Sequence, residues 1–135
     1  MSFTVTFIGA GSIGFTRKLV ADLLSVAEFA DLTINLHDID ADNLDRIAQL
    51  LARDIDANHS RARVHRTTDR REALRDARYV INVARIGGLE AFRHDVEIPL
   101  RYGVDQCVGD TLCAGGIFYA QRGIANILDL CRDIR

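Results

Sequence analysis

A glycine pattern, G-x-G-x-x-G, directly follows a short apolar run near the start of this chain and limits the folds open to it. Gly9, Gly11 and Gly14 supply the glycines, and residues 4–8 before them have the β-branched and aromatic composition of a buried strand. From Ser12 onward the apolar residues recur with helical period. A strand, a glycine turn and a helix in this order predict the start of a βαβ unit.

Apolar runs of strand length alternate with helical segments through the rest of the chain. This alternation predicts an α/β fold of the Rossmann type, a parallel sheet with helices on both faces. Further strands are expected at 32–37, 63–67 and 78–84, and further helices after Asp40, after Asp69, over 89–102 and from 117 to the end. Asp40 is expected to cap its helix, and Asp69 with Glu72 has the spacing of a capping box.

Three of the predicted helices carry an apolar stripe that is expected to face a core. The stripes are Leu19, Val20, Leu23, Leu24 and Ala27; Leu44, Ile47, Ala48, Leu51 and Ile55; and Ile117, Ala120, Ile124, Ile127, Leu128 and Cys131. Pro99 is expected to kink or split its helix, and Gly103 to end it. Because a strand normally follows the last helix of such a sheet, we expect residues 1–135 to be an incomplete N-terminal domain. The last stripe would then be partly exposed.

Each glycine of the motif has an expected role in binding a dinucleotide. Gly9 permits the tight turn, Gly11 lets the backbone approach a pyrophosphate, and Gly14 allows the helix to pack closely on the strand. The helix N-terminus at Ser12 and Ile13 offers N–H groups and a positive dipole end to the phosphates. Ser12 could bond a phosphate or cap the helix, and the two roles are compatible.

Asp38 stands at the end of the second predicted strand. This is near the usual place of the carboxylate that accepts hydrogen bonds from the adenosine ribose. Since a carboxylate there repels a 2′-phosphate, the pattern predicts NAD rather than NADP as the cofactor. The alternative is that the glycines only form a turn and that Asp38 is a solvated residue at a strand end.

Polar residues after the fourth predicted strand are candidates for the nicotinamide and substrate end of the site. Asn82 could contact the cofactor, or it could bond to the neighbouring backbone. Arg85 and Arg93 could hold a substrate anion, or each could lie on the solvated surface. Asp110 and Thr111 lie in a glycine-rich loop before the last helix and could bind a sugar hydroxyl or an anion, although Asp110 could equally cap that helix.

Composition excludes several functional classes. The net charge is −2, 27% of the residues are charged, and the basic residues are scattered, so neither a membrane span nor a nucleic-acid surface is expected. No metal site is expected within this chain, since the histidines and cysteines lack the usual ligand spacing. An odd number of cysteines and no visible signal segment favour reduced thiols and a cytoplasmic location. The histidines are His37, His59, His65 and His94, and the cysteines are Cys107, Cys113 and Cys131.

Five segments together resemble the NAD- and manganese-dependent glycosidases of glycoside hydrolase family 4. They are FIGAGS at 7–12, HDID at 37–40, IGGLE at 86–90, GDTL at 109–112 and GGI at 115–117. The Asp-Thr-Leu segment is most similar to the α-galactosidase (melibiase) branch and its uronidase relatives. The chain departs from the family where Cys113-Ala114 replaces a common Gly-Pro, and where QRGIA at 121–125 replaces Leu-Arg-Thr-Ile-Pro.

The resemblance implies the NAD-binding portion of a glycosidase for α-galactosides, α-glucosides or related uronides. In that family NAD transiently oxidises the sugar 3-hydroxyl, the proton on C2 is removed, and the aglycone leaves by elimination. A divalent metal, usually manganese, polarises the C2 and C3 oxygens. The metal ligands and the tyrosine base are expected outside this chain. No catalytic residue is therefore assigned within this chain, Asp110 is a candidate residue of the substrate loop, and the portion alone is expected to be inactive.

The resemblance also implies a small-molecule glycoside as partner and a homo-oligomer in the full-length protein. Two other functions fit the same residues. One is a hydroxy-acid dehydrogenase of the lactate or malate type, which uses arginines after the fourth strand to hold a carboxylate. The other is an NAD-binding module without catalysis.

Overall fold

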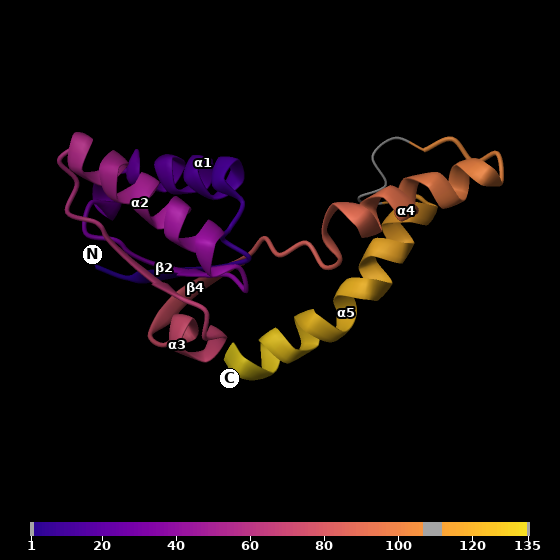
Figure 1. The fold of residues 1–135 in the computed structure, drawn as a ribbon. Helices are drawn as coiled ribbons and strands as arrows, with labels where there is room; N and C mark the ends of the chain where they lie inside the picture. Colours follow the sequence, from indigo (N-terminus) through magenta and orange to yellow (C-terminus); the bar gives the residue numbers. More distant parts are fainter. Residues whose placement is uncertain (1, 107–111, 135) are drawn as a thin grey trace. The chain divides into compact units, whose positions relative to one another are not determined.

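The computed structural model describes residues 2–106 and 112–134, and the chain divides into two compact units (Figure 1). The first unit is Met1–Ala84 and the second is Arg85–Arg135. No helix in the described part of the chain is long and apolar enough to cross a membrane.

The first unit is built on a sheet of four parallel strands. These are β1 (Thr4–Ile8), β2 (Thr33–His37), β3 (Arg63–Thr67) and β4 (Ala77–Asn82), in the order β3-β2-β1-β4. Ile8 at the end of β1 pairs in register with His37 of β2 and with Asn82 of β4. The carboxyl ends of these three strands therefore form one edge of the sheet, and the predicted Rossmann-like α/β fold is confirmed.

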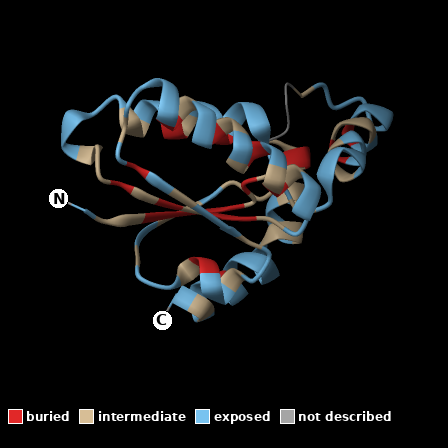
Figure 2. Ribbon diagram, turned by 60° about the vertical axis from the view of Figure 1, so that its left-hand side comes forward, coloured by how far each residue is buried: buried red, intermediate tan, exposed pale blue. Residues whose placement is uncertain are grey.

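Helices cover both faces of this sheet. Two helices, α1 (Ile13–Leu24) and α2 (Ala41–Ala57), lie on one face, and α3 (Arg70–Leu74) lies on the other (Figure 1). Side chains alternate between the faces of a strand, so Val5 and Phe7 enter the core under α1 and α2 while Thr6 faces α3. The core also contains Val20, Leu32, Ile34, Leu36, Leu44, Ile47, Leu51 and Ile55, which form the buried centre seen in Figure 2.

The first predicted stripe extends one residue too far. The helix α1 ends at Leu24, and Ala27 begins a 3₁₀ turn, η1 (Ala27–Phe29), where it is exposed. After this turn the chain enters β2, where Leu32 is fully buried just before the strand. The fourth strand ends at Asn82, two residues before the predicted end.

Helix caps in the first unit follow local side-chain chemistry. The Asp40 carboxylate accepts from the amide of Asn43, as predicted for the cap of α2. The Asp69 carboxylate accepts from the amides of Arg71 and Glu72. The reciprocal half of the predicted capping box is different, because the amide of Asp69 donates to the Thr67 hydroxyl rather than to Glu72. That hydroxyl in turn donates to the Glu72 carboxylate, at 2.5 Å.

The second unit contains two helices that pack against each other, α4 (Gly88–Arg101) and α5 (Ala114–Ile134). Pro99 does not split α4, because it lies in the last turn. Gly103, with φ +72°, ends the helix as predicted. Its amide donates to the carbonyl of Leu100, and the next amide, of Val104, donates to the carbonyl of Pro99. This pair of bonds is a Schellman motif.

The expectation that the stripe of α5 is buried is wrong. Ile117 is 56% exposed and Ile124 is 54% exposed, and Ala120, Ile127, Leu128 and Cys131 are exposed as well. The buried residues of α5 are instead Gly115, Gly116 and Leu130. The helix packs on α4 through its glycine end, where a Cβ on Gly115 would lie 2.5 Å from the carbonyl oxygen of Asp95. The other expectation for this stripe, that it would be partly exposed, is confirmed.

Candidate functional site

The glycine turn joins the end of β1 to the start of α1 at the carboxyl edge of the sheet. Gly9 has φ +83°, and its amide and that of Ala10 both donate to the carbonyl of His37 at 2.9 Å. A Cβ on Gly9 would lie 2.4 Å from the Cα of Ala84, which follows β4. Both the backbone conformation and the space therefore require glycine at this position.

Asp38 is fixed against this turn by two backbone amides. The amide of Gly11 donates to its Oδ2 at 2.7 Å, and the amide of Asp40 donates to its Oδ1 at 3.0 Å. A Cβ on Gly11 would lie 2.8 Å from the same Oδ2. A carboxylate offers about four lone-pair positions, so these two bonds leave acceptor capacity for a ligand. Gly11 therefore allows the carboxylate to approach the turn.

The first turn of α1 differs in detail from the expected roles. Ser12 is the N-cap residue, but its side chain makes no capping hydrogen bond. Ile13 is partly exposed, and a Cβ on Gly14 would meet no atom within 4 Å. The structure therefore gives Gly14 no role in close packing of helix on strand. The first amides of a helix have no intrahelical acceptor and remain available to a ligand.

Thr16 anchors the glycine turn to the first turn of α1, a role that no sequence pattern indicated. Its side chain is fully buried, and its hydroxyl donates to the carbonyl of Ala10 at 2.9 Å. Its amide donates to the carbonyl of Ser12. This one residue thus ties the first turn of α1 to the glycine turn. The sequence feature that could have indicated this role is a small hydroxyl residue one turn after the helix start, on the same helix face as Val20.

His37 was also missed as part of the site. It is buried at the end of β2, its carbonyl receives both turn amides, and its Nδ1 has no hydrogen-bond partner among the described residues. Burial lowers the pKa of its imidazole below the usual value, and the charge of Asp38 opposes that shift. Burial therefore favours the neutral form of the imidazole.

Asn82 lies at the same edge, on the other side of β1. It is exposed, and its Oδ1 accepts a long bond, 3.4 Å, from the amide of Ala84. The contact matches the interpretation as a residue bonded to neighbouring backbone. Its exposed side chain also leaves the cofactor interpretation open.

The arginine candidates belong to the second unit. The guanidinium of Arg85 lies 5.0 Å from the ring centre of Phe92 and 5.3 Å from that of Tyr119. Arg93 is exposed on α4, with its Nε 3.7 Å from Glu97. Asp110, Thr111 and Cys107 lie outside the described residues. Within residues 2–106 and 112–134, no group of three or more histidine, cysteine or acidic side chains could hold a metal ion.

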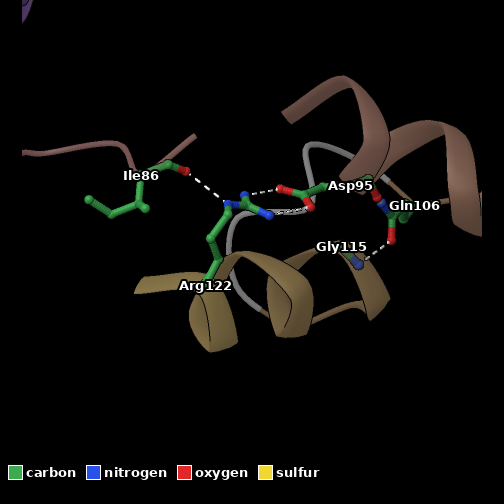
Figure 3. A network of polar contacts seen from close by, with 5 residues as sticks. All are labelled: Ile86, Asp95, Gln106, Gly115 and Arg122. Carbon is green, nitrogen blue, oxygen red and sulfur yellow. Dashed lines mark hydrogen bonds and ion pairs between the residues drawn. The ribbon is translucent and has the colours of Figure 1, made fainter. Parts of the chain in front are cut away.

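A buried ion pair in the second unit was not anticipated from the sequence (Figure 3). Asp95 on α4 is 3% exposed, and Arg122 on α5 donates to its two carboxylate oxygens at 3.0 and 2.6 Å. Hydrogen bonding to Asp95 raises the pKa of the Arg122 guanidinium. The Nε of Arg122 also donates to the carbonyl of Ile86 at 2.9 Å. Sequence spacing held no signal for a pair that two different helices bring together.

The fold and the glycine turn define a Rossmann-like α/β domain with its candidate site at the carboxyl edge of the sheet. A sequence model described as "Family 4 glycosyl hydrolase" matches residues 4–135. The chain therefore belongs to the family 4 glycosyl hydrolases.

Curated relatives and solved structures agree with this assignment. The chain is 58% identical over 134 residues to an α-galactosidase of Rhizobium meliloti (strain 1021), covering 99% of this chain and 27% of the relative. It is 35% identical over 131 residues to an α-galactosidase of Bacillus subtilis (strain 168), covering 96% of this chain and 30% of the relative. The chain thus spans less than a third of these relatives.

A 6-phospho-β-glucosidase from Thermotoga maritima, solved with manganese, NAD⁺ and glucose-6-phosphate, superposes with a TM-score of 0.87. It is 29% identical, and the match covers 98% of this chain and 31% of that one. A 6-phospho-α-glucosidase from gut microorganisms, in complex with NAD and glucose-6-phosphate, gives a TM-score of 0.86 at 28% identity. The match covers 99% of this chain and 30% of that one.

Proposed function

We propose that this chain is the NAD-binding portion of an NAD- and divalent-metal-dependent glycosidase that acts on α-galactosides, α-glucosides or related uronides. The observation that carries the proposal is the Asp38 carboxylate, which the amides of Gly11 and Asp40 hold at the carboxyl edge of the sheet. Family membership and the α-galactosidase relatives support the glycosidase class. The α-galactoside is the substrate favoured by the 58% identical relative.

The residues at the sheet edge fit a dinucleotide. The two fixed oxygens of Asp38 can accept the hydroxyls of an adenosine ribose, and the first amides of α1 face the position of a pyrophosphate. The same carboxylate would repel the 2′-phosphate of NADP. Because backbone amides hold the side chain, Asp38 cannot turn away to relieve that repulsion without losing both bonds.

The chemistry divides between the cofactors and the residues of this chain. When bound, NAD supplies reversible oxidation of the sugar 3-hydroxyl, and a divalent metal supplies Lewis-acid polarisation of the neighbouring oxygens. The metal ligands and the base are expected to come from other parts of the enzyme. Within this chain, Arg85 and Arg93 are proposed to contact the substrate, through its carboxylate where the substrate is a uronide. Asp110 and Thr111 are proposed to contact sugar hydroxyls. A homo-oligomer and a cytoplasmic location remain predictions for the whole enzyme.

Calorimetric titration of the chain with NAD and NADP tests the cofactor site. We expect NAD to bind at least about tenfold more tightly than NADP, and Asp38→Ala to weaken NAD binding by about tenfold or more, which is about 1.4 kcal/mol. Asp42→Ala is the matched control, because it removes an exposed carboxylate four residues away on α2. A folded chain that binds neither nucleotide would overturn the cofactor assignment.

Two activity measurements separate this function from the alternatives. A lactate- or malate-type dehydrogenase would accumulate NADH with a hydroxy acid, whereas the proposed glycosidase would cleave a glycoside without net NADH formation. Arg85 lies three residues after the end of β4, which fits the dehydrogenase alternative, but family membership favours the glycosidase. A module without catalysis would bind NAD yet cleave no glycoside when joined to the remainder of a relative.

A further inference from the structure

The buried ion pair of the second unit also fixes the loop that leads into α4. The carbonyl that Arg122 binds belongs to Ile86, the residue between Arg85 and Gly87. Gly87 has φ +86° and is the N-cap residue of α4. A Cβ on Gly87 would lie 3.1 Å from the Nε of Arg122 and 2.5 Å from the Cβ of Ala91. The conformation of this loop is therefore fitted to the side chain of Arg122.

Two aromatic rings link this fixed loop to the guanidinium of Arg85. Tyr119, one turn before Arg122 on α5, has its ring centre 5.3 Å from the Arg85 guanidinium and 5.9 Å from that of Arg122. Phe92 on α4 has its ring centre 5.0 Å from the Arg85 guanidinium. The rings come from different helices, and the Asp95–Arg122 pair joins those helices. Arg85 is thus connected to that pair in two ways, through the backbone carbonyl of Ile86 and through the ring of Tyr119.

We infer that Arg122 is a positioning residue that holds the 85–87 loop and thereby sets where Arg85 presents its guanidinium. The inference rests on the proposed function, in which Arg85 contacts the substrate. Arg122 acts through Arg85 and does not itself contact substrate. The planar fork of arginine is required because three nitrogen donors serve Asp95 and Ile86 together, whereas lysine offers a single point charge.

Limited proteolysis of the chain tests the positioning directly. Trypsin cleaves after Arg85 only when the loop leaves its folded conformation, so the initial rate of release of fragment 1–85 measures loop opening. Arg122→Lys keeps a cation beside Asp95 but lacks the fork, so we expect this rate to rise about tenfold while the melting temperature changes little. Arg132→Lys is the matched control, because Arg132 lies on the same helix in an exposed pair with Asp129.

A second variant covers the case in which Arg122→Lys does not fold. Asp95→Asn combined with Arg122→Gln removes both charges together, so no unpaired charge is left buried. It should release fragment 1–85 faster than the native chain at equal distance from the melting temperature. Unchanged release from folded Arg122→Lys, or from this double variant, would overturn the positioning role.

The link to catalysis is tested in a chimera of the Rhizobium meliloti α-galactosidase in which the 134 matched residues are replaced by those of this chain. Nitrophenyl α-galactoside and nitrophenyl α-galacturonide are the two probes. Arg85→Gln first identifies the probe whose KM depends on Arg85. For that probe, we expect Arg122→Lys to raise KM severalfold and to change kcat by less than about twofold. In the Arg85→Gln background, Arg122→Lys should add nothing further.

The outcomes of these experiments are distinguishable. Equal effects of Arg122→Lys with and without Arg85, or a loss of kcat alone, would show that Arg122 does not act through Arg85. A folded chimera that cleaves neither glycoside would contradict the proposed function, while the proteolysis would still decide whether Arg122 holds the loop.

Discussion

The amide of Gly11 and the carboxylate of Asp38 are joined by a 2.7 Å hydrogen bond at the carboxyl edge of the sheet. The contact requires glycine, since a Cβ on Gly11 would lie 2.8 Å from the accepting oxygen. It connects the turn after β1 with the end of β2, and it orders the carboxylate before a ligand is present. Binding a ribose there would not have to immobilise the side chain, which favours affinity.

Gly11→Ala should therefore weaken NAD binding more than it weakens the fold. The added methyl group displaces the Asp38 carboxylate, so we expect an affinity loss of about tenfold or more and a stability loss of about 1 kcal/mol. Gly14→Ala is the matched control for stability, because its methyl group would enter open space in a helix and should stabilise by up to about 1 kcal/mol. Calorimetry and urea unfolding measure the two effects. Equal NAD affinity of Gly11→Ala and the native chain would refute this account.

The stability of the first unit should fall as the pH is lowered through the range in which an unfolded histidine titrates. Burial lowers the pKa of His37 in the folded chain, so the unfolded chain binds more protons between the two pKa values. Stability consequently rises with pH up to about 6.5, the usual histidine value, and is level above it with respect to this group.

His37→Gln should flatten that pH dependence, and His65→Gln, an exposed strand residue, serves as control. Urea unfolding at closely spaced pH values measures the slope. A slope below pH 6.5 that persists unchanged in His37→Gln would assign the dependence to other groups.

Asp95→Asn should lower the melting temperature of the second unit by roughly 5–10 °C, because it leaves the Arg122 cation without its buried partner. Asp129→Asn removes an exposed pair on α5 and should shift the melting temperature by less than about 2 °C. Thermal unfolding followed by circular dichroism compares the two variants. Similar shifts in both would mean that burial adds nothing to the Asp95–Arg122 pair.

The exposed stripe of α5 should make the chain associate at high concentration. Ile124 and Ile127 are 54% and 43% exposed on one helix face, where they offer apolar area to a second copy. Glutamate at both positions should reduce association, whereas Gln121→Glu, at an exposed polar position, should not. Sedimentation velocity over a concentration series measures the effect. A native chain that stays monomeric throughout would contradict the prediction.

Local patterns predicted the elements whose formation depends on neighbouring residues. The carboxylate of Asp40 and the positive φ of Gly103 begin and end helices as expected, because caps need only the adjacent backbone. The stripe of α2 is buried at Leu44, Ile47, Leu51 and Ile55, since its period matches the helix. The stripe of α5 has the same period but is exposed, because periodicity shows which residues share a face and does not show what covers that face.

Short-range sequence patterns were enough to predict the parallel α/β fold, the glycine turn at the end of β1 and the carboxylate at the end of β2. These follow from hydrophobic period, glycine conformation and residue order, which are properties of short segments. Three contacts became visible in the folded chain: Gly11 binds Asp38, Thr16 anchors the turn, and Arg122 joins Asp95 to Ile86. Those contacts join different segments in space, and their hydrogen bonds depend on helix packing and strand register that no local pattern specifies.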